Sequence, residues 1–286
     1  MHIQGHRGAR GNRPGNSLAS LEFALDCQVD SIETDLQITA DGAVVLFHDV
    51  EAARVDGKAA LVGEFTLDAL RTWFDRPISK TSCFPEQRVE AGPFTMAFAK
   101  KKGINPWTIP TLTDLFEFVA EYSGEFGQSQ GKMLPQQECA RKLVLDLEIK
   151  QLPSLAMNWR GILAGIALEA KERKWAFRVV VRSFDHGILR QAKMMNLGTG
   201  LGLLTDETIL HDPVATMRDL GATLFCPKFD CLNQDMSREI QAAGFRVMPW
   251  TLNLPSAWEL ARDWGVDGIT TDYPGWLRDW LKSCTK

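Results

Sequence analysis

The sequence has no apolar run of the roughly 18 residues that a membrane-spanning helix needs. Its N-terminal stretch also has no apolar segment of the kind found in signal peptides. The six cysteines form no Cys-x-x-Cys pair and are too few for a disulfide framework, and their spacing does not support a zinc site. These absences predict a cytoplasmic protein with ordinary thiols and no integral membrane segment.

A strong charge of one sign is also missing. The chain has 32 Lys and Arg against 36 Asp and Glu, a net charge of -4, so we expect no nucleic-acid partner. No P-loop pattern is present, which argues against a nucleoside triphosphate. Hydrophobic residues make up 45% of the 286 residues, the balance of a folded globular chain. We predict a single domain over residues 1–286; the sequence does not indicate an oligomeric state.

Short apolar runs alternate with helix-sized segments along most of the chain, a pattern typical of a parallel sheet with crossover helices. The nine predicted strands are 3–6, 31–36, 44–48, 143–149, 178–183, 200–204, 223–227, 246–250 and 267–272. Helices are expected at 17–26, 154–174, 185–195, 236–244 and 256–265.

One strand does not fit the alternation. The connection from 31–36 to 44–48 is too short for a parallel crossover, and Asp41-Gly42 is a strong two-residue hairpin signal. The strand at 44–48 should therefore run antiparallel as a projecting arm, with His48 directly opposite Asp35. The remaining eight strands predict a (β/α)8 TIM barrel.

Two stretches interrupt the pattern. Residues about 50–109, after the second barrel strand, predict a small insertion with a helix at 66–74. Its apolar residues either line a substrate groove or, as we favour, pack in the core: Phe94, Met96, Phe98, Ile104 and Trp107. Residues about 121–142 are polar and turn-rich, and predict a long loop.

Glu33 and Asp35 lie two apart in a predicted strand, so both carboxylates point to one face. The predicted hairpin adds His48 to that face. An ordinary solvated hairpin face would explain the same residues.

In the strand 143–149 and just after it, Asp146, Glu148 and Lys150 alternate with apolar residues. Because the helix-facing side of a barrel strand is apolar, these charged side chains should point inward. They would form either an internal ion pair of Lys150 with a carboxylate or part of a cation site.

The first strand ends in Gly5-His6-Arg7-Gly8, which places His6 and Arg7 at the end where barrels carry active sites. Glu33, Asp35 and Glu148 should face the same mouth. Three such carboxylates need a cation, and an all-oxygen set suits Mg²⁺ or Ca²⁺. Two histidines and two cationic side chains beside that metal suggest cleavage of a phosphate ester.

At this point the sequence resembles the glycerophosphodiester phosphodiesterase family. HRGARGNRPGNSLASLEFAL resembles the family's opening His-Arg-Gly motif, and VDSIETDLQITADGAVVLFHD is similar to its most specific block. Further blocks follow in the family's order: IPTL (109–112), LDLEIK (145–150), VRSFD (181–185), PWTLN (249–253) and GVDGITTDYP (265–274).

The resemblance implies a (β/α)8 barrel that hydrolyses glycerophosphodiesters, a small-molecule substrate, to glycerol 3-phosphate and an alcohol. It implies that one divalent cation is bound by Glu33, Asp35 and Glu148. His6 and His48 would be the catalytic acid/base pair, in roles we leave unassigned, and Arg7 and Lys150 would hold the phosphate. One departure is Gly15, which stands where the family has Glu.

Several alternatives stay open. The attacking oxygen is either water or the glycerol 2-hydroxyl, which would give a cyclic intermediate. Trp250 is either an apolar wall for the glycerol carbons or a core residue. The substrate is either a small head-group diester or a lysophospholipid, as in a lysophospholipase D. A non-catalytic phosphodiester-binding protein is the other class, favoured only by Gly15.

Overall fold

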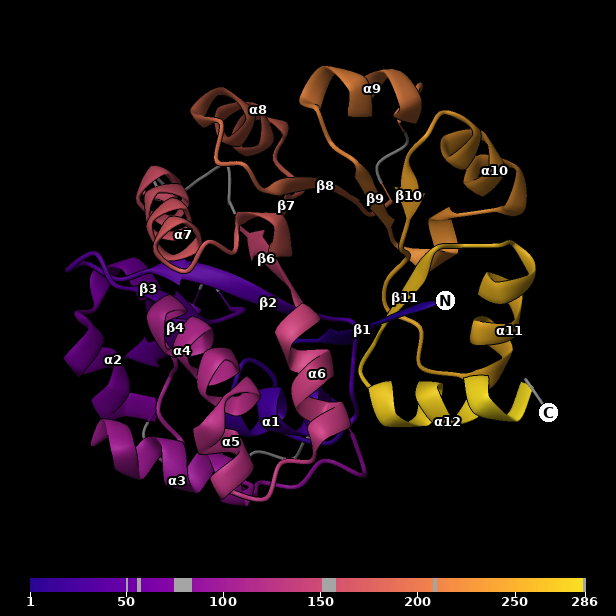
Figure 1. The fold of residues 1–286 in the computed structure, drawn as a ribbon. Coiled ribbons are helices and arrows are strands. Elements are labelled where there is room, and N and C mark those ends of the chain that lie inside the picture. Colours follow the sequence, from indigo (N-terminus) through magenta and orange to yellow (C-terminus); the bar gives the residue numbers. More distant parts are fainter. Residues whose placement is uncertain (50, 56–57, 75–83, 151–157, 208–209, 285–286) are drawn as a thin grey trace.

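A computed structural model describes residues 1–49, 51–55, 58–74, 84–150, 158–207 and 210–284 of the chain. Eight parallel strands form a nearly closed barrel, in the order β10-β9-β8-β7-β6-β2-β1-β11, with helices around the outside (Figure 1). The strands are β1 His2–His6, β2 Ser31–Ile38, β6 Val144–Ile149, β7 Val179–Ser183, β8 Gly200–Thr205, β9 Leu224–Pro227, β10 Arg246–Val247 and β11 Gly268–Thr271. The predicted TIM barrel is confirmed.

The two ends of this strand path are joined by backbone hydrogen bonds. Thr270 N donates to Pro249 O at 3.0 Å, and Leu252 N donates to Thr270 O at 3.0 Å. Of the predicted strand 246–250, only Arg246–Val247 is regular strand, although Met248 N and Trp250 N still donate to Phe225 O and Pro227 O of β9.

The crossover helices are α1 Leu18–Asp26, α7 Trp159–Glu172, α8 His186–Met195, α9 Pro213–Leu220, α10 Gln234–Ala242, α11 Pro255–Asp263 and α12 Pro274–Cys284. Polar side chains cap several N-termini: the Ser17 hydroxyl accepts from Ser20 N, and the Asp185 carboxylate accepts from Gly187 N and Ile188 N. Residues 154–157 of one predicted helix lie outside the described residues. None of the described helices is long and apolar enough to cross a membrane.

The arm is formed by β3, Val44–Leu46, which pairs antiparallel with β2. The expected register is wrong by one residue: Leu36 pairs with Leu46, and Phe47 N donates to Asp35 O at 3.0 Å, so Phe47 rather than His48 is opposite Asp35. The cause is a three-residue loop closed by the hydrogen bond from Thr39 N to Ala43 O, with Gly42 at φ +87°.

Between the arm and β6 the chain forms β4 Glu51–Val55, β5 Lys58–Leu61, the short 3-10 helix η1 Val62–Glu64, α2 Leu67–Phe74 and α3 Pro93–Lys102. The hairpin of β4 and β5 was not predicted. Phe94 and Phe98 are buried and meet Phe118 of α4, Leu112–Ser123, edge-on. Met96, in contrast, is exposed. Of the five apolar residues expected to pack in the core, Phe94 and Phe98 do so fully, and Ile104 packs half-buried against it.

Residues 121–142 are not a loop, and that prediction is wrong. They form the end of α4, α5 Glu125–Ser129 and α6 Leu134–Lys142. Polar side chains hold these short helices together. Gln137 Nε2 donates to Tyr122 O and Gly124 O, and Lys132 Nζ reaches Glu22 and Asp26 of α1. The polar side chains that suggested a loop instead form hydrogen bonds and ion pairs at the ends of these helices.

The five cysteines among the described residues are free, as expected, and Cys83 lies outside them.

Candidate active site

The candidate site lies at the carboxyl end of β1, β2 and β6, the end at which barrel enzymes carry their chemistry. The strand register brings its residues together: His6 pairs with Glu33, and Asp35 pairs with Glu148. Their side chains point into the barrel, while alternate residues such as Leu147 join the core under the helices.

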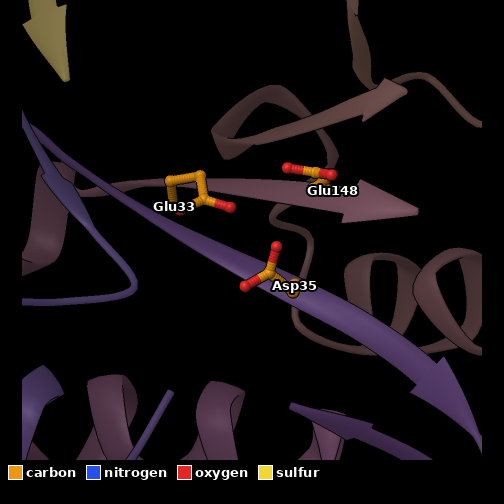
Figure 2. Close-up of side chains that lie close together, drawn as sticks. All are labelled: Glu33, Asp35 and Glu148. Atoms are coloured by element: carbon orange, nitrogen blue, oxygen red, sulfur yellow. The ribbon is translucent and has the colours of Figure 1, made fainter. Parts of the chain in front are cut away.

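Glu33, Asp35 and Glu148 form an acidic triad. One carboxylate oxygen from each lies within 4.8 Å of the others, and all three side chains are buried. Figure 2 shows Glu33 and Asp35 on β2 and Glu148 on β6, with their carboxylates directed toward one another. The predicted convergence of these residues is therefore present, as is the inward direction of Glu148.

Two cations contact the triad from the mouth. Arg7 Nε lies 3.0 Å from Asp35 Oδ2, and Lys150 Nζ lies 3.0 Å from Asp35 Oδ1 and 2.5 Å from Glu148 Oε1. Burial alone would raise the pKa of Asp35, but Arg7 and Lys150 outweigh it and hold that pKa well below its usual range. The internal Lys150 ion pair is thus formed within the same cluster as the triad.

Glu33 is the triad member whose compensation is weaker than its burial, although Arg7 N donates to its Oε2 at 3.0 Å. Burial, followed by the charge of Asp35, raises the pKa of Glu33 to about 8. Its Oε1 atom has no hydrogen-bond partner among the described residues, and Arg182 Nη2 is 3.5 Å away. A buried, unpartnered carboxylate oxygen facing two further carboxylates fits a divalent cation bound through oxygen ligands.

His6 lies beside the triad at the end of β1. Its Nδ1 is 2.7 Å from Asp272 Oδ1, and its Nε2 is 3.8 Å from Glu33 Oε2. Burial lowers the pKa of His6 to about 4, although Asp272 opposes the shift. Because an ionised carboxylate only accepts hydrogen bonds, Nδ1 carries the proton and Nε2 presents a lone pair toward the triad.

His48 follows the end of β3, and its side chain is 38% exposed. Its Nδ1 is 2.7 Å from Asp49 Oδ1, and Gln37 Nε2 donates to Asp49 O at 2.9 Å, which ties this segment to β2. Burial lowers the pKa of His48, and the nearby charge of Asp35 opposes that shift. His48 therefore lies within electrostatic range of the triad, although no hydrogen bond joins them.

Sequence reasoning missed two residues that hold the site. Asp272, after the last strand, orients His6 and accepts from Asn253 Nδ2 at 2.7 Å. Asn16 Nδ2 donates to Asp35 Oδ2 at 2.8 Å, from a backbone with φ +58°. Both residues lie inside motif blocks and in loops that follow barrel strands, and this position could have indicated that they belong to the site.

Asp146 points inward as predicted but lies below the triad. Its Oδ2 accepts from Gln4 Nε2 at 2.7 Å and lies 3.3 Å from Arg182 Nη1. These three buried side chains fill the barrel interior beneath Glu33.

Trp250 follows β10 at the opposite side of the mouth. Its indole Nε1 donates to Cys226 O at 3.0 Å, and its ring meets Phe184 edge-on at 5.8 Å. The half-buried ring also packs against a small apolar cluster that includes Met248. This packing is compatible with both predicted roles, so contact with substrate stays a prediction.

The comparisons with known proteins agree with this geometry. The "Probable glycerophosphodiester phosphodiesterase 1" of Mycobacterium tuberculosis is 39% identical over 290 residues, covering 98% of this chain and 92% of the relative. A crystal structure from Silicibacter pomeroyi has a TM-score of 0.78 at 23% identity, covering 100% of this chain and 94% of its own.

A second solved structure, an Oleispira antarctica phosphodiesterase in complex with the product sn-glycerol-3-phosphate, has a TM-score of 0.72 at 21% identity. It covers 99% of this chain and 97% of its own. The family model described as the glycerophosphoryl diester phosphodiesterase family matches residues 6–276. The chain belongs to the glycerophosphoryl diester phosphodiesterase family.

Proposed function

We propose that this chain hydrolyses glycerophosphodiesters to glycerol 3-phosphate and an alcohol in a metal-dependent reaction. The observation that carries the proposal is the buried triad of Glu33, Asp35 and Glu148 with His6 Nε2 facing it. Membership of the family, and a structural neighbour that holds sn-glycerol-3-phosphate as its product, support the same reaction.

Glu33, Asp35 and Glu148 would hold one divalent cation, Mg²⁺ or Ca²⁺, which both accept carboxylate ligands. When bound, the cation supplies positive charge that polarises the phosphate oxygens. Arg7 and Lys150 then become available to the phosphate, because the cation replaces them as the counter-charge of Asp35 and Glu148.

His6 and His48 would share the proton transfers. One histidine takes the proton of the attacking oxygen, and the other donates a proton to the departing alkoxide, a contribution of about 10²-fold or more each. The unprotonated His6 Nε2 suits a proton acceptor, and the position of His48 at the rim suits contact with the leaving or attacking group. Trp250 would border the glycerol carbons.

The test is release of glycerol 3-phosphate from glycerophosphocholine with Mg²⁺, with Ca²⁺ and with EDTA. We expect release that depends on the metal and is lost in His48→Ala, with His211→Ala as the matched control because His211 is remote from the motif blocks. Faster turnover of lysophospholipids would instead identify a lysophospholipase D. Diester binding without hydrolysis under any metal would identify a binding protein and overturn the proposal.

Two further expectations accompany the proposal. The single-domain organisation over residues 1–286, with the inserted subregion at about 50–109, and the cytoplasmic location both stay predictions. Size-exclusion chromatography and limited proteolysis would test the first, since one domain yields no stable fragments.

A further inference from the structure

Arg10 is a third cation at the mouth, beyond Arg7 and Lys150, and the reaction described above does not use it. It lies in the loop after β1, and its side chain is 31% exposed. Its guanidinium carbon stands 5.0 Å from the ring centre of Phe84, which fixes one face of the group. Gln87 Nε2 donates to Arg10 O at 2.6 Å and holds the backbone of this loop in place.

The guanidinium of Arg10 has little carboxylate compensation. Among the described residues, Asp272 is the one carboxylate within 4 Å, with its Oδ1 3.9 Å from Arg10 Nη1. That carboxylate already binds His6 Nδ1 at 2.7 Å and Asn253 Nδ2 at 2.7 Å. A guanidinium carries five N–H donors, so most of those of Arg10 remain available to a ligand.

Position 15, occupied by glycine, is a place from which a carboxylate could reach Arg10. A Cβ atom at position 15 would lie 3.2 Å from Arg10 Cγ and 3.1 Å from Arg7 Cβ, so this position lies between the two arginines. An acidic side chain there would be placed beside both guanidinium groups. With glycine in that place, no side chain from position 15 stands beside the two arginines, and Arg10 keeps only the 3.9 Å contact with Asp272 as carboxylate compensation among the described residues.

The position of Arg10 also sets which part of a substrate it meets. The Nε2 side of His6 faces Glu33 and the triad, whereas the Nδ1 side faces Asp272 and, behind it, Arg10. Arg10 Nη1 therefore approaches the Asp272 side of His6, whereas the Nε2 side of the ring faces the triad, where the scissile phosphate would bind. This position favours contact of Arg10 with another part of the substrate.

We propose that Arg10 is a specificity-determining residue that binds an acidic substituent on the substrate, outside the scissile phosphate. This inference rests on the proposed function and adds the substrate class: diesters whose alcohol carries a carboxylate or a second phosphate. Gly15 permits this preference by placing no carboxylate beside the guanidinium, whose contact with Asp272 is long at 3.9 Å.

The experiment uses two diesters that differ by one carboxylate, glycerophosphoserine and glycerophosphoethanolamine. The ratio of their kcat/KM values is measured for the wild type and for Arg10→Gln under the same metal. We expect the wild type to favour the serine diester and Arg10→Gln to lower the ratio about 10-fold, through KM of the serine diester, as one charge-assisted hydrogen bond is lost.

A second pair of variants tests the same idea from position 15. Gly15→Glu adds a carboxylate beside Arg10, and Gly15→Gln adds a side chain of the same size without the charge. We expect Gly15→Glu to lower the ratio relative to Gly15→Gln. The pair remains informative if Arg10→Gln folds poorly, because steric effects are common to both variants.

The outcomes separate cleanly. An equal loss on both diesters in Arg10→Gln, or an unchanged ratio in both tests, overturns the specificity role while leaving the proposed hydrolysis intact. An equal loss would instead assign Arg10 to positioning Asp272. Hydrolysis of neither diester by the wild type with either metal overturns the proposed function, and this inference with it.

Discussion

At the scale of single residues, Asp272 acts on the candidate site through its contact with His6. It orients His6 through Nδ1 and keeps Nε2 unprotonated toward the triad. An amide at this position can donate to Nδ1 and so favours the wrong tautomer.

We therefore expect Asp272→Asn to lower kcat by about 10²-fold or more, with a small effect on KM, since the defect lies in proton transfer. Steady-state kinetics on glycerophosphocholine measures both constants. The control is Asp267→Asn: Asp267 accepts from Val247 N and Gln241 Nε2, away from His6. A loss of kcat no greater than that of the control would show that His6 does not depend on Asp272.

At this scale, the site residues that could be predicted are those whose partner lies two positions away in the same strand. Glu33 with Asp35, and Asp146 with Glu148, follow from the period of two in a strand. Asn16 and Asp272 were not predicted because each acts on a partner in a different strand-loop unit. Those contacts depend on how β1, β2 and β11 are placed around the barrel.

At the scale of elements, the arm of β2 and β3 carries His48, and its loop sets the register. Gly42 has φ +87°, and no atom lies within 4 Å of a Cβ built there, so glycine is required by the backbone alone. A residue with a side chain in this conformation costs about 1–2 kcal/mol.

Gly42→Ala should accordingly lower the free energy of unfolding by about 1–2 kcal/mol. Urea unfolding followed by circular dichroism measures the change. Gly63→Ala is the matched control, because Gly63 has an ordinary φ and its added Cβ would make only a 3.6 Å contact with Ile38 O. Equal effects of the two variants would contradict the three-residue loop.

Element identity was easier to predict than element register. The nine predicted strands are all present, yet the predicted register of the hairpin was wrong by one residue. The Asp-Gly pair indicates a turn but does not specify whether two or three residues form its loop. The helices α5 and α6 were missed because their stabilising partners, such as Glu22 and Asp26, lie far away in the sequence.

At the scale of the whole molecule, the buried charge of the acidic triad links the proposed metal binding to folding. Glu33 has an ordinary pKa of 4.5, and burial with Asp35 raises it to about 8. Between these values the metal-free folded state holds a proton that the unfolded state lacks, so stability falls as pH rises. His6 acts in the opposite direction, but only below its ordinary value of 6.5.

From pH 6.5 to about 8 we therefore expect the Tm of the metal-free protein to decrease and its metal affinity to increase, by up to about tenfold per pH unit for the one proton displaced. Calorimetric unfolding scans and titrations with Mg²⁺ or Ca²⁺ measure both trends. Glu33→Gln removes the proton and should flatten the Tm trend. A Tm that rises over this interval would contradict the assignment.

The barrel was predictable from the sequence because strands and helices alternate along most of the chain. The pairing of charged side chains inside the barrel was predictable only in part. Arg182 was not anticipated in the barrel floor, since its partners Asp146, Gln4 and Glu33 come from three other strands.

The pairing of β1 with β11 has a consequence for how the protein is made. Strand β1 carries His6 at its end, yet one of its two neighbours is residues 268–271, and Asp272 follows directly. A ribosome therefore synthesises His6 266 residues before its hydrogen-bond partner Asp272. The nascent chain cannot form the His6–Asp272 contact before residue 272 has been translated, so products that stop before it should be inactive.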